Sequence, residues 1–183
     1  SRERIHGVIT EGGGAPNIIP DRAAGRFYVR AANRAELEVL KQRVASCFEA
    51  GALATGARLE VAWGEADYLD IRRNEPLEDA FRANAERLGR SFFPLEKLPA
   101  SLAGSTDMGN VSQRVPSIHP MLAAAPIHCT IHNAEFAVHA RAEIGDRAAI
   151  DVAKALAMTA LDVLTDADLR ERARAIFESR ASD

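Results

Sequence analysis

The amino-acid sequence of 183 residues predicts an α/β fold, because strand-like and helix-like segments both occur along it. A polar stretch lies near its centre. Runs of β-branched and aromatic residues indicate strands at residues 5–10, 17–30 and 58–64. Apolar residues at helical spacing predict the two longest helices, at residues 34–53 and 147–164. Residues 104–136, rich in Gly, Ser, Thr and His, cannot be regular throughout. Function usually lies in loops of that composition.

The first two strand-like segments are expected to pair as a hairpin. Residues 12–14 are three consecutive glycines, which suit a tight connection between them. Pro16 and Pro20 restrict residues 17–30 to an edge or a bulged entry, because proline cannot donate a hydrogen bond to a neighbouring strand.

A helix and a third strand are expected to follow the hairpin. Asn33 with Glu36 forms an Asn-x-x-Glu start signal for the helix at residues 34–53, which is expected to end near Gly56. Residues 58–64 alternate apolar and polar side chains, as a half-buried strand does. This β-β-α-β order lacks the first strand and helix of a symmetric split arrangement, so the chain is expected to begin within a domain.

The second part of the chain is predicted to be mainly helical. Residues 65–73 form a charged connector, and a helix runs from Asn74 to Gly89. Further helices are expected from Asp107 to before Pro116, at residues 147–164, and from Asp166 or Asp168 through Ser179. Residues 118–122 are interpreted as a buried strand, and the apolar helix at 147–164 is expected to pack flat on a sheet.

Composition agrees with part of a cytoplasmic enzyme. Hydrophobic residues make up 47% of the chain, and the net charge of -3 gives no basic excess, so no nucleic-acid partner is expected. No apolar run approaches the roughly 20 residues that span a bilayer, so no membrane partner is expected either. Cys47 and Cys129 are too few for a disulfide scaffold, and Cys47 is expected to be a small buried hydrophobe on its helix.

Four of the five histidines fall inside or just beyond the central polar stretch: His119, His128, His132 and His139. On a helix, the spacing of His128 and His132 would place both imidazoles on one face, within reach of one metal ion. The intervening Cys-Thr-Ile is a poor helix former, so the same histidines also fit a polar loop without metal. Spacing alone leaves both interpretations open.

The motifs of this stretch resemble a known family. Residues 104–112 read GSTDMGNVS and residues 115–120 read VPSIHP. Together with residues 4–13, 15–20 and 153–162, they are similar to the zinc-dependent amidohydrolase and peptidase family of aminoacylases, glutamate carboxypeptidases and aminobenzoyl-glutamate hydrolases. The branch that the chain resembles most is that of the aminobenzoyl-glutamate hydrolases and dipeptidases.

The resemblance implies a division of the chain. Residues 1–64 would be the last part of a ferredoxin-like βαββαβ lid, or dimerisation domain, and residues 65–183 the C-terminal part of an α/β zinc-peptidase catalytic domain. In that family the lid forms a homodimer, and a metal-bound water attacks an amide carbonyl.

The metal site implied by the resemblance has one candidate ligand in this chain. His132, in the segment His-Asn-Ala-Glu-Phe, matches the last metal-binding histidine of the family, and His128 is a weaker candidate. Glu135 is expected to orient the loop or to hydrogen-bond a ligand. The cofactor is expected to be one or two zinc ions in the complete enzyme, although manganese or cobalt would suit the same ligands.

The resemblance also implies substrate-binding residues. Asn17 and Arg30, thirteen residues apart, match an asparagine and an arginine that reach the active site of the neighbouring subunit and hold the substrate carboxylate. An arginine guanidinium suits bidentate carboxylate binding. Ser105, Thr106 and Asp107 match a loop near the substrate, and Asp107 equally fits a helix cap.

Other parts of the family's site have no counterpart here. The family's His-x-Asp segment and adjacent Glu-Glu pair, which includes the general base, do not occur in this sequence. One imidazole cannot hold a catalytic zinc, which needs about three protein ligands, so this chain alone is expected to be inactive and to contain no catalytic residue.

Two functions of different classes remain open at this point. In the first, the chain is the C-terminal portion of a metal-dependent amidohydrolase acting on an N-acyl amino acid, an aminobenzoyl-glutamate or a dipeptide-like amide. Its partner would be the N-terminal half of the enzyme, on a separate chain or lost. In the second, the chain is a non-catalytic fragment or dimerisation module without bound metal.

Overall fold

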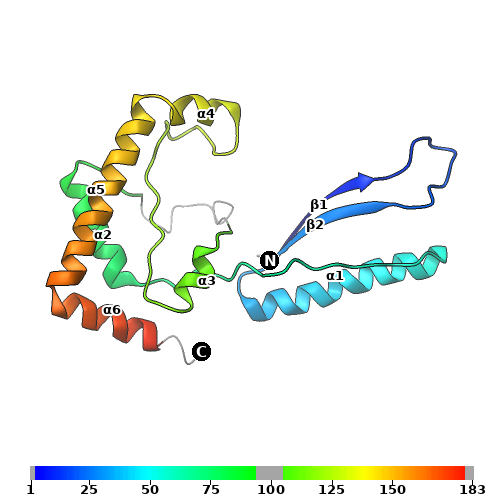
Figure 1. Cartoon of the computed structure of the whole chain (residues 1–183), viewed down its shortest axis with the longest axis horizontal. Helices are drawn as coiled ribbons and strands as arrows, with labels where there is room; N and C mark the ends of the chain where they lie inside the picture. Colours follow the sequence, from blue (N-terminus) through cyan, green and yellow to red (C-terminus); the bar gives the residue numbers. More distant parts are fainter. Residues whose placement is uncertain (1–2, 94–104, 180–183) are drawn as a thin grey trace. The chain divides into compact units, whose positions relative to one another are not determined.

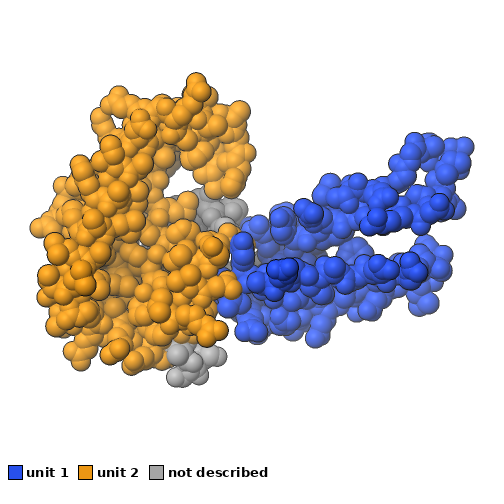
Figure 2. Space-filling model, in the orientation of Figure 1, with its two compact units in different colours: residues 1–70 blue, residues 71–183 orange. Residues whose placement is uncertain are grey.

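A computed structural model describes residues 3–93 and 105–179. The chain divides into two compact units, residues 1–70 and residues 71–183, which Figure 2 distinguishes by colour. Gly104, the first residue of the central motif, and Pro94 lie outside the described residues.

The hairpin predicted for the first unit is confirmed, but its second strand begins at Ala24 rather than at Asn17, so the connection is longer than the three glycines at residues 12–14. Strand β1 (Arg4–Glu11) pairs antiparallel with β2 (Ala24–Arg30), and the register is interrupted between Ile9 and Glu11 (Figure 1). Gly7 lies opposite Phe27, whose ring occupies the space that a side chain at Gly7 would need. The glycine therefore lets an aromatic ring lie flat across the sheet.

Helix α1 (Arg34–Thr55) starts and ends where local signals predict. The Asn33 side chain accepts a hydrogen bond from the Glu36 backbone N–H at 2.9 Å, and Glu36 reaches back to accept from the Ala32 N–H at 3.4 Å. The helix ends at Gly56, whose φ of 68° is left-handed. The Phe48 ring meets Phe27 of β2 edge-on, with centroids 5.0 Å apart.

The expectation that Cys47 is buried is wrong, because the Cys47 side chain is exposed. In α1 the buried residues are Leu40 and Val44, about two turns and one turn before it. The two described strands of this unit do not cover the later turns of a 22-residue helix, so its apolar face remains open there.

Residues 58–64 are not a strand, contrary to the prediction. A strand needs a neighbouring backbone to pair with, and the sheet of the described residues ends with β1 and β2. The segment instead contacts α1 through side chains. The Lys41 ammonium lies 5.2 Å from the centre of the Trp63 ring and 3.2 Å from the Asp67 carboxylate. The hydrogen bond to Asp67 raises the pKa of Lys41 above its usual 10.5.

The second unit is built on three helices, α2 (Glu75–Arg87), α5 (Glu143–Thr165) and α6 (Ala167–Ser179). Helix α2 contacts both α5 and α6, and Figure 1 shows α6 turning away from the axis of α5 directly after α5 ends. Two groups of buried apolar residues form the core: Leu77, Leu169 and Ala173 in one, and Phe81, Ala85 and Ala155 in the other. The three predicted helices are confirmed, and α5 begins at Glu143 rather than at Arg147.

Buried polar groups in this core are paired with one another. The Asn74 amide donates to the Ala173 carbonyl at 2.8 Å, joining the start of α2 to α6. The Asn84 amide donates to the Thr159 hydroxyl at 3.2 Å and to the Asp162 carboxylate at 2.6 Å, joining α2 to α5. Because an unpaired buried amide is costly, these bonds fix how the helices align.

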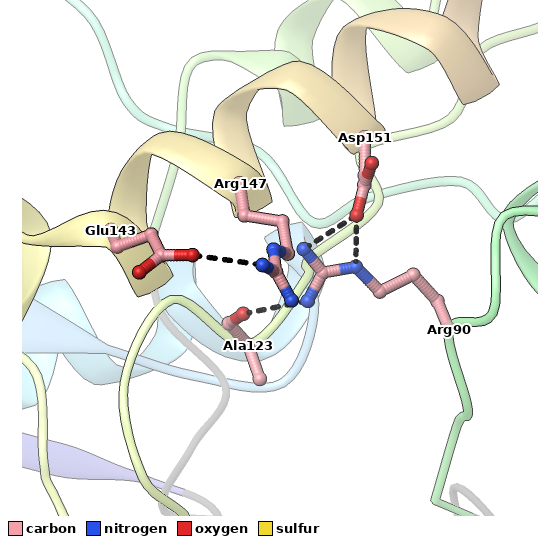
Figure 3. Close-up of polar contacts among 5 residues, drawn as sticks. All are labelled: Arg90, Ala123, Glu143, Arg147 and Asp151. Carbon is pink, nitrogen blue, oxygen red and sulfur yellow. Dashed lines mark hydrogen bonds and ion pairs between the residues drawn. The ribbon is translucent and has the colours of Figure 1, made fainter.

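An ion pair joins the end of α2 to the middle of α5 (Figure 3). The Arg90 guanidinium approaches one oxygen of Asp151 through Nε at 2.8 Å and through Nη2 at 2.8 Å. The two side chains are only 19% and 15% exposed. The pair formed by Glu143 and Arg147, also drawn in Figure 3, is by contrast 86% and 68% exposed.

Residues 118–122 are not a strand either. The described part of the second unit contains no other strand with which they would pair. Their apolar side chains are nevertheless used: Ile118 packs against both core groups and Leu122 against the second. The side chains of Ile118 and Leu122 therefore hold the segment against the helices.

Helix α5 has a second apolar face that the described residues leave open. The sheet on which the sequence predicts it to pack is not among them. Exposed aliphatic residues follow one another along this face: Ala149, Ile150, Ala153, Leu156, Ala157, Ala160, Leu161 and Leu164. A shallow apolar groove of about 290 Å³ lies at the start of the helix, against Pro120, Leu122 and Ala140. No described helix is long and apolar enough to cross a membrane.

Candidate functional site

The candidate metal ligands lie around a short helix that the sequence analysis missed, α4 (Ala134–Ala140). Its start is fixed by Asn133, which accepts a hydrogen bond from the Phe136 N–H at 2.7 Å and donates to the Thr130 hydroxyl at 3.0 Å. An asparagine cap before Ala-Glu-Phe was a usable signal for this helix.

His132 immediately precedes this cap and has a left-handed backbone, with φ of 67°. Histidine adopts that conformation less readily than glycine, so the turn holds it at some cost in backbone energy. Its side chain is exposed, as is that of His128. Residues 128–132 are not helical, so the two imidazoles do not share a helix face.

The structure instead brings together Cys129, Glu135 and His139. One potential ligand atom from each, all within 4.8 Å of one another, forms a cluster that we call the α4 cluster. Glu135 and His139 are four residues apart on α4 and so lie on the same side of the helix. Cys129 joins them from the loop, where its N–H donates to the Pro126 carbonyl at 2.9 Å. His132 is not a member of the cluster.

Glu135 is the acidic member of this cluster and affects its neighbours. Partial burial raises the pKa of the Cys129 thiol, and the nearby Glu135 carboxylate raises this pKa further. His128 approaches the same carboxylate, with its Nε2 atom 3.6 Å from Glu135 Oε1. Glu135 thus lies between a thiol and two imidazoles, of His128 and His139.

The predicted substrate loop leads into a short helix, α3 (Met108–Ser112). Asp107 occupies the cap position but its carboxylate makes no capping hydrogen bond; the Thr106 hydroxyl accepts from the Met108 N–H at 3.3 Å instead. Ser105 and Asp107 are exposed and Thr106 is half-buried. The buried Ser112 anchors the motif by accepting from the Arg72 N–H at 2.9 Å.

Asn17 and Arg30 lie at opposite ends of the hairpin. Arg30 ends β2 opposite Arg4, whereas Asn17 lies in the connection beyond Glu11, at the other end of the ladder. About six residue steps of strand, on the order of 20 Å, separate the two ends. The Arg30 guanidinium lies 5.9 Å from the centre of the Tyr28 ring. The hairpin therefore does not bring the two predicted carboxylate-binding side chains together.

Comparison with known proteins gives one clear similarity. The chain is 37% identical to an Xaa-Arg dipeptidase of Homo sapiens and 36% identical to an Xaa-Arg dipeptidase of Mus musculus, in each case over 98% of its own length. It spans 41% and 42% of those two proteins. No protein-family model matches the chain.

Proposed function

We propose that this chain is the C-terminal portion of a zinc-dependent amidohydrolase that cleaves a dipeptide-like amide by metal-activated water. The observation that carries the proposal is the 37% identity to a dipeptidase over 98% of the chain. The motifs at residues 104–112 and 115–120, which lie within this match, agree with it because they resemble the same zinc-dependent family.

The donors available in this chain suit a contribution to a zinc site rather than a whole one. His132 offers an exposed imidazole held by a left-handed turn at the start of α4, and imidazole nitrogen is a common zinc ligand. When bound, zinc would polarise the scissile carbonyl and supply an activated water. The further ligands and the general base would come from the portion of the relatives that this chain does not span.

A dipeptide with C-terminal arginine is the substrate we propose, by analogy with the name of the relatives. Such a substrate presents a free carboxylate, which Arg30 would bind through its guanidinium and Asn17 through its amide. Because the two residues lie at opposite ends of the hairpin, we propose that they serve two different active sites, or one site completed by a second subunit.

Homodimerisation through residues 1–64 follows from the same proposal. The open edges of the hairpin and the exposed apolar side chains of Ile5, Val8 and Ile9 are compatible with a covering partner. The exposed face of α5 would likewise be covered by the rest of the catalytic domain.

The test is hydrolysis by natively purified material, together with its intact mass and metal content. Dipeptides that differ only in a C-terminal Arg, Lys or Leu would be compared with aminobenzoyl-glutamate. We expect a second polypeptide or a longer chain, bound zinc, and the highest kcat/KM for the arginine dipeptide. His132→Gln should abolish turnover, and Arg30→Ala should mainly raise KM.

A second candidate is a dimerisation module without catalysis, favoured because His132 is the single ligand that the resemblance assigns to this chain and the sequence contains neither a His-x-Asp segment nor a Glu-Glu pair. This alternative would be established if the chain formed a folded dimer that binds no metal and hydrolyses no substrate, even with its natural partners present. The same result would refute the proposed enzyme.

A further inference from the structure

The α4 cluster combines three kinds of ligand atom: a thiol sulfur, a carboxylate oxygen and an imidazole nitrogen, from Cys129, Glu135 and His139. All three act as ligands of zinc and of metals with similar preferences, whereas calcium and magnesium prefer oxygen alone. This combination of ligand atoms suits a transition-metal ion better than calcium or magnesium.

The spacing of these atoms is close to that of a bound ion. Tetrahedral zinc, with bonds of about 2.0 to 2.3 Å, places its ligand atoms roughly 3.3 to 3.7 Å apart. Here the three atoms already lie within 4.8 Å of one another. Movements of about 1 Å, which small side-chain rotations provide, would close the site.

The backbone around the cluster is fixed by hydrogen bonds. Asn133 caps α4 at 2.7 Å, which sets the direction of the helix that carries Glu135 and His139. The turn from Pro126 to Cys129, closed at 2.9 Å, presents the thiol to them. Carboxylates that bind metals are commonly held by a second group, and His128 lies in that position beside Glu135 at 3.6 Å.

We propose that Cys129, Glu135 and His139 form a binding site for a zinc-like divalent ion within this chain, with the fourth position left to water. His128 is a positioning residue for Glu135 in this site. The site is separate from the ligand role of His132 and does not rest on the proposed hydrolase function.

The probe is cobalt(II), added to the whole chain under reducing conditions. A thiolate bound to cobalt gives an intense near-ultraviolet charge-transfer band, which carboxylate and imidazole ligands do not give. We expect one cobalt per chain with this band. Cys129→Ser should abolish the band, and His139→Gln or Glu135→Gln should weaken binding at least about tenfold.

The chain offers matched controls. Cys47→Ser removes the other, exposed cysteine, and His119→Gln removes an exposed histidine outside the cluster; neither should change the band or the affinity. A second measurement uses the unmodified protein: zinc should protect Cys129 from alkylation, and Cys47 in the same sample should remain reactive.

Three outcomes would overturn the proposal. One is a band that persists in Cys129→Ser or is lost in Cys47→Ser, and another is equal alkylation of both cysteines with and without zinc. The third is a cobalt site that His132→Gln abolishes and Cys129→Ser leaves intact. That last result would refute this site and leave the proposed hydrolase standing. Conversely, absence of hydrolysis with a Cys129-dependent band would refute only the hydrolase.

Discussion

Replacement of Asp151 by asparagine should destabilise the second unit strongly. The substitution keeps the shape of the side chain and removes its charge. Arg90 then remains a cation with its Nε and Nη2 atoms directed at a neutral amide, where it now has two contacts of 2.8 Å to a carboxylate oxygen. Its side chain is 19% exposed, so water compensates only part of the loss.

The size of the effect follows from burial. Removing one partner of a fully buried ion pair costs about 3–5 kcal/mol. Because Asp151 and Arg90 retain 15% and 19% exposure, we expect the lower end, about 3 kcal/mol. For a unit of this size, that corresponds to a fall in Tm on the order of 10 °C.

Urea unfolding followed by far-ultraviolet circular dichroism would measure this loss. Glu143→Gln is the matched control, because it breaks the exposed pair with Arg147 on the same helix and should cost less than about 0.5 kcal/mol. The double change Arg90→Met with Asp151→Leu should recover part of the stability, since no buried charge is left alone. A loss for Asp151→Asn no larger than that for Glu143→Gln would refute the argument.

Two further predictions concern a close helix contact and a titrating lysine. Gly145→Ala should lower the free energy of unfolding by about 1–3 kcal/mol, because the added Cβ would lie 2.3 Å from the Ala140 carbonyl oxygen; Gly51→Ala, with no atom within 4 Å, should be neutral or stabilising. The Tm of each variant would be compared with that of the wild type, and an equal change in Tm for both variants would contradict this prediction. The contact between Lys41 and Asp67 raises the folded pKa of the lysine, so its stabilisation is complete below pH 10.5 and is lost as pH rises through the raised pKa. Asp67→Asn should flatten that alkaline loss in Tm measurements from about pH 9 to about pH 12, and an unchanged profile would show that Asp67 is not responsible.

Elements with signals inside their own sequence were predicted well. Asn33 with Glu36 marked the start of α1, and Gly56 marked its end, because caps depend on residues a few positions apart. Residues 58–64 and 118–122 have strand-like patterns as well, yet neither is a strand. Strand formation requires a partner backbone, and sequence pattern alone does not supply one.

The candidate site shows the same limit. The four-residue spacing of His128 and His132 suggested a pair of metal ligands, whereas the structure brings together Cys129, Glu135 and His139. The spacing of Glu135 and His139 would have been informative had α4 been predicted from its asparagine cap. Cys129 approaches Glu135 and His139 because of an irregular turn. Such a turn has no periodic sequence pattern from which its course could be predicted.

The missing side chain of Gly145 has a consequence for how the α4 cluster can respond to an ion. The Ala140 carbonyl lies where a methyl group would be, and the Ala142 N–H donates to the His139 carbonyl at 3.0 Å, so the two helices meet at a tight corner. Glu135 and His139 therefore lie on a helix whose position against α5 is set before an ion binds. Cys129 is not part of these helices. Binding of an ion would therefore mainly move the turn formed by residues 126–129.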